Sequence, residues 1–214
     1  MTDVAWALAA VTIAFALADW AFVLRDNRSG RFVTKPATLA ALIGVAVAME
    51  PTVSSGIRTA MVVGLVLSLA GDVFLLLREK YFIFGLATFL LGHVAYVVGL
   101  QMADTSLVGT LAGLAVVAVS IVIVGRHFLP AIRGGENKEL VVPGITYAVV
   151  ISSMVVSAFG TLSPWAIIGA TLFYISDGTL AWNRFLEVRR WGHIAVMVTY
   201  HLGQFGLVAW LVWP

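Results

Sequence analysis

Residues 68–77 read Ser-Leu-Ala-Gly-Asp-Val-Phe-Leu-Leu-Leu, an apolar run that holds one carboxylate, Asp72. A second run with the same character, residues 174–181, reads Tyr-Ile-Ser-Asp-Gly-Thr-Leu-Ala and holds Asp177. A charged side chain at the centre of a membrane helix costs about 2.5–3.5 kcal/mol on insertion scales, and such residues usually face a bundle interior and have a function. The two aspartates are therefore the strongest functional signal in this sequence.

The composition is that of an integral membrane protein. The chain has 214 residues, of which 61% are hydrophobic and 11% charged, with a formal net charge of +2. Soluble domains carry about 25% charged residues. The basic residues lie in loops and form no patch, so no nucleic-acid partner is expected. The absence of cysteine excludes disulfides, thiolate metal sites and thiol nucleophiles.

The apolar runs predict an all-α, polytopic membrane protein of eight transmembrane helices, in one domain over residues 1–214. A bilayer core requires about 20 apolar residues per helix. The predicted spans are residues 4–24, 36–49, 57–77, 81–101, 106–128, 139–159, 164–184 and 192–213. The first follows an acidic Asp3 and no clear cleavage site ends it, so we interpret it as a helix and not a signal peptide. Pro36, Pro143 and Pro164 are expected in or near first turns, where the missing N–H is harmless.

The loop charges predict the orientation in a cell membrane. Twelve of the 13 Lys and Arg residues fall in or beside four alternate loops, and the remaining one is Arg58. By the positive-inside rule, both termini face away from the cytoplasm. At 1.5 Å per residue, Asp72 and Asp177 lie roughly 9–11 Å inside the cytoplasmic boundary. Asp19 is near the same end of the first span, and Lys35 lies at the mouth of the second.

The spacing raises the hypothesis of two parallel four-helix repeats. Asp72 and Asp177 are 105 residues apart, and Pro36 and Pro143 are 107 apart. Parallel repeats would place the two aspartates at equal depth, facing each other across an internal axis.

The paired aspartates predict general acid and base chemistry. A single buried Asp can instead have a structural role, but two at equal depth beside other polar residues favour function. In an apolar site one carboxyl can stay protonated while its partner is ionised. Tyr174, Asp177 and Arg184 share one helix face, and Asn183 points toward an adjacent helix.

The histidines give only a weak metal signal. His93 and His201, with the two aspartates, are residue types that bind zinc, but no short-range ligand motif is present. We therefore expect no metal and no cofactor. His127 and His193 are expected near the interface, in solvent. Glycine pairs in the fourth and eighth spans are expected to permit close helix contact; they are Gly85 and Gly92, and Gly203 and Gly206.

Several motifs, in order along residues 10–210, resemble the YhhN-like lysoplasmalogenase family. They are Thr34-Lys35-Pro36, Ser68 through Asp72, Phe84-Gly85 with Phe89, His93 and Tyr96, Tyr147, Ser176-Asp177 with Leu180-Ala181 and Asn183-Arg184-Phe185, and Tyr200 with Gln204.

The resemblance implies an eight-helix enzyme that hydrolyses the vinyl ether bond of lysoplasmalogens. Its products would be a fatty aldehyde and a glycerophospho-ethanolamine or -choline. Asp72 and Asp177 carry over as the acid/base pair. The implied pocket residues are Lys35, His93, Tyr96, Tyr147, Asn183, Arg184, Tyr200 and Gln204. His201 stands where the family has an aromatic residue and receives no role. The implied partners are membrane lipids and a lysophospholipid substrate, with no obligate protein partner.

Two alternatives remain open. One is a proton-coupled or lipid transporter or binding protein, because ion-coupled transporters also bury carboxylates between repeats. The other is a metal-dependent membrane lipid hydrolase that acts on another bond. Against transport, the outer half carries almost no polar residues and no pair of helices is broken at mid-membrane. In the enzyme, Arg184 with Lys35 or Arg78 is expected to contact the lipid phosphate.

Overall fold

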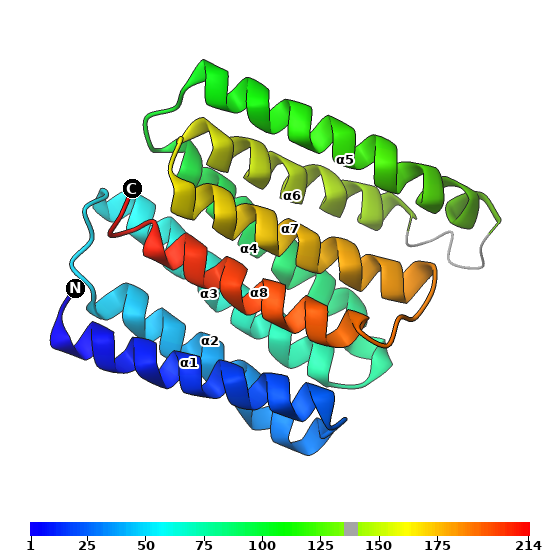
Figure 1. Ribbon diagram of the computed structural model, residues 1–214, viewed down its shortest axis with the longest axis horizontal. Helices are drawn as coiled ribbons and strands as arrows, with labels where there is room; N and C mark the ends of the chain where they lie inside the picture. Colours follow the sequence, from blue (N-terminus) through cyan, green and yellow to red (C-terminus); the bar gives the residue numbers. More distant parts are fainter. Residues whose placement is uncertain (135–140) are drawn as a thin grey trace.

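Eight α-helices and one short 3-10 helix make up the computed structural model, which describes residues 1–134 and 141–214 (Figure 1). The elements are α1 (Asp3–Leu24), α2 (Arg28–Ala48), α3 (Ser55–Leu76), η1 (Glu79–Tyr81), α4 (Phe82–Gln101), α5 (Leu107–Gly134), α6 (Val141–Gly160), α7 (Pro164–Phe185) and α8 (Gly192–Ala209). The prediction of an all-α protein with eight helices is confirmed.

Six of the described helices are long and apolar enough to cross a membrane, and the chain is a multi-pass membrane protein. They are α1, α2, α3, α4 together with η1, residues 107–128 of α5, and α6. The helices α7 and α8 do not reach this apolarity because they carry many of the polar side chains, including Asp177 and Arg184 on α7 and His201 and Gln204 on α8. Of the eight transmembrane helices predicted, six therefore meet this criterion among the described residues.

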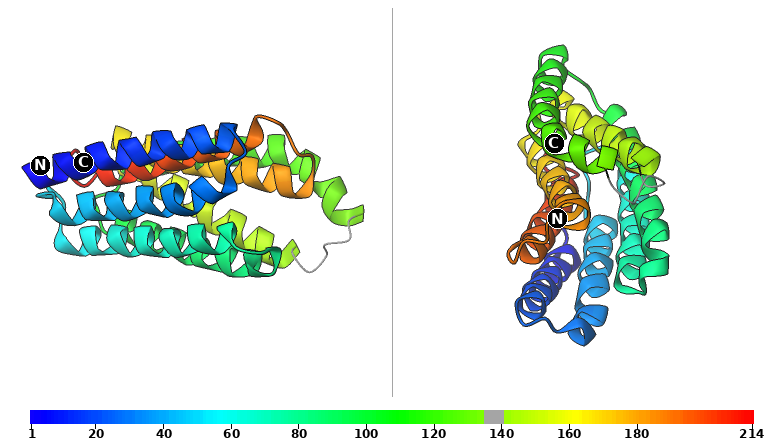
Figure 2. Two further views of the ribbon diagram at one scale, coloured as in Figure 1. Left: turned by 90° about the horizontal axis from the view of Figure 1, so that it is seen from below. Right: turned by 90° about the vertical axis from the view of Figure 1, so that its right-hand side faces the viewer.

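Seven helices form a closed ring. In order around it, α1, α2, α3, α4, α6, α7 and α8 each pack against the next, and α8 returns to α1 (Figure 2). The helix α5 lies outside the ring and packs mainly on α6. The described contacts do not by themselves show two equivalent four-helix halves, and the repeats stay a hypothesis.

Both termini lie at one end of the bundle (Figure 1), which we call the terminal end. Hydrogen bonds join segments there: for example, the Thr2 hydroxyl donates to the carbonyl of Ala48 at 2.8 Å, and the Thr52 N–H donates to the carbonyl of Leu211 at 2.9 Å. The loops α1–α2, α3–α4 and α7–α8, which carry many of the cations, lie at the opposite end, which we call the basic end.

The second helix begins eight residues earlier than predicted. It begins at Arg28, and the side chain of Asn27 caps it by accepting the Gly30 N–H at 3.0 Å. Pro36 therefore lies inside the helix, and the prediction that it marks the first turn is wrong. The basic residues before Pro36 had the polarity of a loop, which is why the start was misplaced. As a result, Lys35 lies within α2 and is buried.

The other proline positions agree with prediction. Pro164 is the first residue of α7, and Pro143 is the third residue of α6 as described. The predicted start of the sixth span at residue 139, and Lys138, lie outside the described residues.

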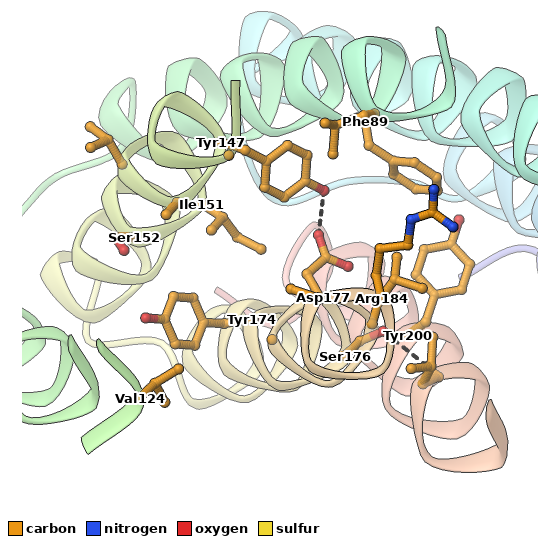
Figure 3. A pocket seen from close by; sticks show the side chains of 18 of the residues that line it. Phe89, Val124, Tyr147, Ile151, Ser152, Tyr174, Ser176, Asp177, Arg184 and Tyr200 are labelled. Carbon is orange, nitrogen blue, oxygen red and sulfur yellow. Dashed lines mark hydrogen bonds between the residues drawn. The ribbon is translucent and has the colours of Figure 1, made fainter. Parts of the chain in front are cut away.

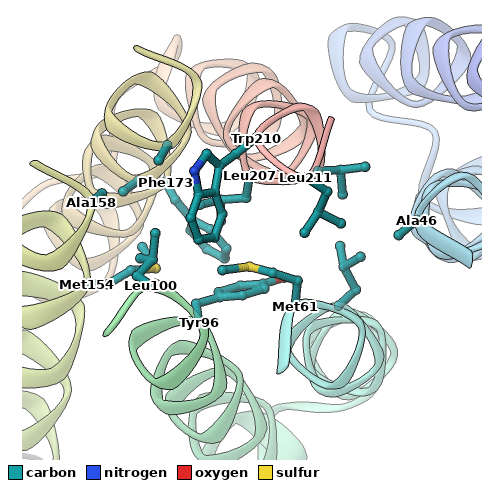
Figure 4. Close-up of a cluster of buried hydrophobic side chains, with 14 of the residues drawn as sticks. Ala46, Met61, Tyr96, Leu100, Met154, Ala158, Phe173, Leu207, Trp210 and Leu211 are labelled. Atoms are coloured by element: carbon teal, nitrogen blue, oxygen red, sulfur yellow. The ribbon is translucent and has the colours of Figure 1, made fainter. Parts of the chain in front are cut away.

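Large apolar side chains pack against one another inside the ring (Figure 4). Tyr96, Phe173 and Trp210, with Met61 and Leu207, are each 0–1% exposed. They come from α3, α4, α7, α8 and the residues just after α8, so packing fills the space between these four helices toward the terminal end.

Glycines allow the closest helix contact. A Cβ atom added to Gly206 of α8 would lie 2.7 Å from the Cα of Gly169 on α7, and one added to Gly203 would lie 2.9 Å from the Phe173 nitrogen. A Cβ at Gly92 of α4 would lie 3.1 Å from the Gly64 carbonyl on α3. The predicted role of these glycines in close packing is confirmed. Their contacts hold the two aspartate-bearing helices, α3 and α7, each tightly against one neighbour.

Candidate active site

A cavity of about 1260 Å³ opens the basic half of the bundle and continues toward the terminal end beside α5 and α6. Side chains of α2 to α8 line it. Charged lining residues, including Arg31, Glu79 and Arg184, lie at the basic end. The lining residues nearer the terminal end include the apolar Val97 and Val117. Ligand pockets typically measure 300–1,000 Å³. This cavity is thus large enough for a lipid with one chain.

Asp72 is completely buried at the wall of this cavity, in an ion pair. Its Oδ1 lies 2.9 Å from the Nζ of Lys35, whose side chain is 8% exposed. Its Oδ2 accepts a hydrogen bond from the Tyr200 hydroxyl at 2.8 Å. Three helices, α2, α3 and α8, therefore meet at one carboxylate, and its charge is balanced by a lysine.

Asp177 lines the same cavity but has different partners (Figure 3). Its Oδ2 accepts a hydrogen bond from the Tyr147 hydroxyl of α6. The Nε2 of His93 on α4 lies 3.7 Å from the same oxygen and would be charged only if protonated. The salt bridges formed by described residues give Asp177 no lysine or arginine partner.

The two carboxyl groups therefore differ in their electrostatic surroundings. The ammonium group of Lys35 stabilises the ionised form of Asp72, because opposite charges at this distance attract strongly in a site of low dielectric constant. Asp177, among a phenol, an imidazole and apolar walls, is the group suited to carry a proton. Two carboxyls with unlike surroundings are how one site supplies both an acid and a base.

Four of the eight predicted pocket residues line the cavity with the two aspartates: Lys35, Tyr147, Arg184 and Tyr200. Three others are buried behind its wall. The Tyr96 hydroxyl donates to Gln204 Oε1 at 2.6 Å, and His93 is 1% exposed. His93, Tyr96 and Gln204 therefore support the wall of the cavity and do not line it.

The eighth predicted pocket residue, Asn183, contacts the α7–α8 loop. Its Oδ1 accepts the backbone N–H of Arg189 at 3.2 Å in the α7–α8 loop, and it is not among the residues that line the cavity. It follows that Asn183 shapes the loop. Helical spacing already predicted that Asn183 does not share the helix face of Asp177.

The residues predicted to contact the lipid phosphate differ in where they lie. Arg184 lines the cavity, but it forms an exposed ion pair with Glu79. Arg78 is exposed and does not line the cavity. His193 is exposed as predicted, yet it lines the cavity at the basic end.

A second buried polar cluster, between α1, α2 and α8, was missed. Asp19 is completely buried and accepts hydrogen bonds from the Thr34 hydroxyl at 3.0 Å and from Arg31 Nε at 3.4 Å. Nearby on α1 and α8, Trp20 Nε1 donates to His201 Nδ1 at 3.0 Å. The sequence signal was a carboxylate in an apolar run, the same signal that identified Asp72.

Metal ligands do not gather in this site. Within residues 1–134 and 141–214, no group of three or more His, Asp or Glu side chains is placed to hold a metal ion.

Comparison with known proteins places the chain in context. The model of a protein family described as the YhhN family matches residues 30–211. The human protein named lysoplasmalogenase TMEM86B is 28% identical over 165 residues, which is 76% of this chain and 67% of the human protein. The proteins of the same name from mouse and rat are each 29% identical, and the matches cover 59% and 54% of their lengths. No solved structure matches the chain significantly.

Proposed function

The chain belongs to the YhhN family, and from this premise we propose that it is a membrane hydrolase that cleaves the vinyl ether bond of a lysolipid. The products are a fatty aldehyde and a glycerophospho head group. The similarity to proteins named lysoplasmalogenase supports this choice of bond. The observation that carries the proposal is a pair of aspartates with unlike partners on the wall of one lipid-sized cavity.

The shape of the cavity fits a lipid with one chain. The wall of α6 runs ten residues from Tyr147, beside Asp177, to Ser157 near the terminal end, which is about 15 Å at 1.5 Å per residue. The hydrocarbon core of a bilayer is about 30 Å thick, so the hydrocarbon of one leaflet is about as thick as this wall is long. A chain in this part of the cavity would contact apolar side chains of α4, α5 and α6, such as Val97, Val117 and Ile151.

The reaction begins with a proton from Asp177. The proton adds to the alkenyl carbon farther from the oxygen, and the carbon bonded to the oxygen becomes an oxocarbenium cation. The Asp72 carboxylate stabilises this cation and accepts a proton from the attacking water, as paired carboxylates do in glycosidases. The resulting hemiacetal breaks at its carbon–oxygen bond to the glycerol: its hydroxyl group gives a proton to Asp177, and the leaving oxygen takes the proton held by Asp72. This gives the aldehyde, releases the glycerophospho alcohol and returns both aspartates to their starting states. One water is consumed.

The decisive test offers the purified protein three lysolipids of equal chain length, with vinyl ether, alkyl ether and acyl linkages. We expect aldehyde from the vinyl ether alone, because neither of the other linkages has an alkene to protonate. The alkyl ether and acyl lipids should compete as inhibitors. Fatty acid from the acyl lipid, with no aldehyde from the vinyl ether, would instead identify a lysophospholipase.

We also propose that residues 1–214 form one domain whose termini both face away from the cytoplasm. The supporting observation is that the termini lie at one end of the bundle, opposite the basic loops. A reporter that is active only outside the cytoplasm, fused after Pro214, is expected to be active. A cytoplasmic reporter at the same point should be silent, and the reverse pattern would show that the orientation is inverted.

A further inference from the structure

Three cationic side chains line the cavity in the part of the chain that the structure describes: Arg31, Lys35 and Arg184. A lysolipid whose ether bond reaches the aspartates would bring its phosphate toward the basic end. Which of these cations meets the phosphate depends on what each of them already contacts.

Two of the three cations, Lys35 and Arg184, are less suited to bind the phosphate. Lys35 is committed to Asp72, at 2.9 Å. Arg184 is the most exposed of the three, forms an ion pair with Glu79, and has its guanidinium carbon 4.7 Å from the ring centre of Phe82. Its side chain is thus engaged at the surface of the protein.

Arg31 is held differently. Its Nε donates to the buried carboxylate of Asp19, and the Thr34 hydroxyl donates to the same carboxylate oxygen. The Arg31 side chain is 22% exposed and lines the cavity. A guanidinium group has five N–H donors, and the bond to Asp19 uses only the one on Nε. The remaining edge of the guanidinium can form the paired hydrogen bonds that a phosphate accepts.

The position of Arg31 along α2 also fits. Arg31 precedes Lys35 by one helical turn, which is about 6 Å toward the basic end. In a lysolipid, the glycerol carbons separate the ether oxygen from the phosphate. With the ether bond beside Asp72 and its partner Lys35, the glycerol would span this one turn.

We propose that Arg31, oriented by Asp19, is the residue that binds the phosphate of the lysolipid head group. This inference rests on the proposed function, since it names the head-group contact of the same site. It makes Asp19 a positioning residue and leaves Arg184 outside the phosphate contact.

Binding of uncleavable lipids tests the proposal without relying on hydrolysis. The probes are an alkyl ether lysophospholipid and the neutral alkylglycerol of the same chain length, each titrated into the purified full chain. We expect the wild type to bind the phospholipid at least about 10-fold more tightly, since hydrogen bonds to charged groups are strong. Arg31→Gln should abolish this preference by weakening phospholipid binding only, and Arg31→Lys should retain part of it.

Matched variants separate local from general effects. Arg25→Gln removes an exposed cation just after α1, near the start of α2, and should leave the preference unchanged. Arg184→Gln should also leave it nearly unchanged. If Arg31→Gln does not fold because Asp19 loses its partner, the double variant Asp19→Asn/Arg31→Gln removes both charges and should show the same loss of preference.

Several results would overturn the assignment. Equal weakening of both lipids by Arg31→Gln would mean that Arg31 acts only through the fold. Loss of preference in Arg184→Gln, but not in Arg31→Gln, would move the phosphate site to α7. Inorganic phosphate that competes as well as the lysophospholipid would show a site for a free anion and not for a lipid. Phosphate-selective binding without any aldehyde release would preserve this site and reject the proposed reaction.

Discussion

Asp177→Asn is expected to lower the rate of aldehyde release by about 10²–10⁴-fold, the usual contribution of a general acid or base. The substitution removes the proton donor and keeps the shape of the side chain. The Asn carbonyl can still accept the hydrogen bond from Tyr147, so the melting temperature should change little. Initial rates with a vinyl ether lysolipid, measured beside thermal unfolding in the same detergent, test both statements.

Asp72→Asn should cause a loss of similar size, because the oxocarbenium cation and the attacking water both lose their carboxylate. Asp26→Asn is the matched control. Asp26 is exposed and has φ = 51°, a left-handed conformation that Asn adopts readily, so this variant should behave as the wild type. Near-normal turnover in either Asp72→Asn or Asp177→Asn would assign that aspartate a structural role.

Lys35→Met is expected to destabilise the protein by about 3–5 kcal/mol, as is typical when one partner of a buried ion pair is removed. The methionine leaves the Asp72 carboxylate, which is 0% exposed, without its counter-charge. The double variant Lys35→Met/Asp72→Asn removes both charges and should recover most of the lost stability. It should remain inactive, because the base is still missing. Unfolding in detergent, followed for both variants, gives the comparison.

Lys80→Met provides the control, since Lys80 is an exposed cation at the same end of the bundle and its loss should alter stability little. If Lys35→Met unfolds no more easily than Lys80→Met, the ion pair does not stabilise the fold. A double variant as unstable as Lys35→Met alone would point to the packing of the lysine stem and not to its charge.

The helices and the two aspartates could be predicted because their signals are local. Apolar runs and basic loops indicate the helices, and a carboxylate within an apolar run stands out without any knowledge of its neighbours. The start of α2 was harder. The segment before Pro36, which holds Arg28 and Arg31, has the composition of a loop. Only the contacts of α2 with α1 and α3 show that the helix begins there and continues through Pro36.

The partners of the aspartates could not be predicted, because they depend on tertiary structure. Lys35 reaches Asp72 because α2 packs beside α3. Tyr147 reaches Asp177 because α6 lies beside α7 in the ring. The same limit explains Asn183, whose side chain bonds to a loop, and Arg31, whose relation to Asp19 requires the turn between α1 and α2. Residue type indicated that these positions were polar, but not which atom each would reach.

In the proposed reaction, the course of the cavity determines where the two products go. On the α5 side, Leu114 and Ile121 line the cavity and are 49% and 56% exposed, and both belong to the part of α5 that is long and apolar enough to cross a membrane. A released long-chain aldehyde would pass sideways into the membrane, while the charged alcohol leaves at the basic end. Aldehydes condense with amines to form Schiff bases. Discharge into lipid would keep this electrophile from the lysines of soluble proteins and deliver it to enzymes that work at the membrane.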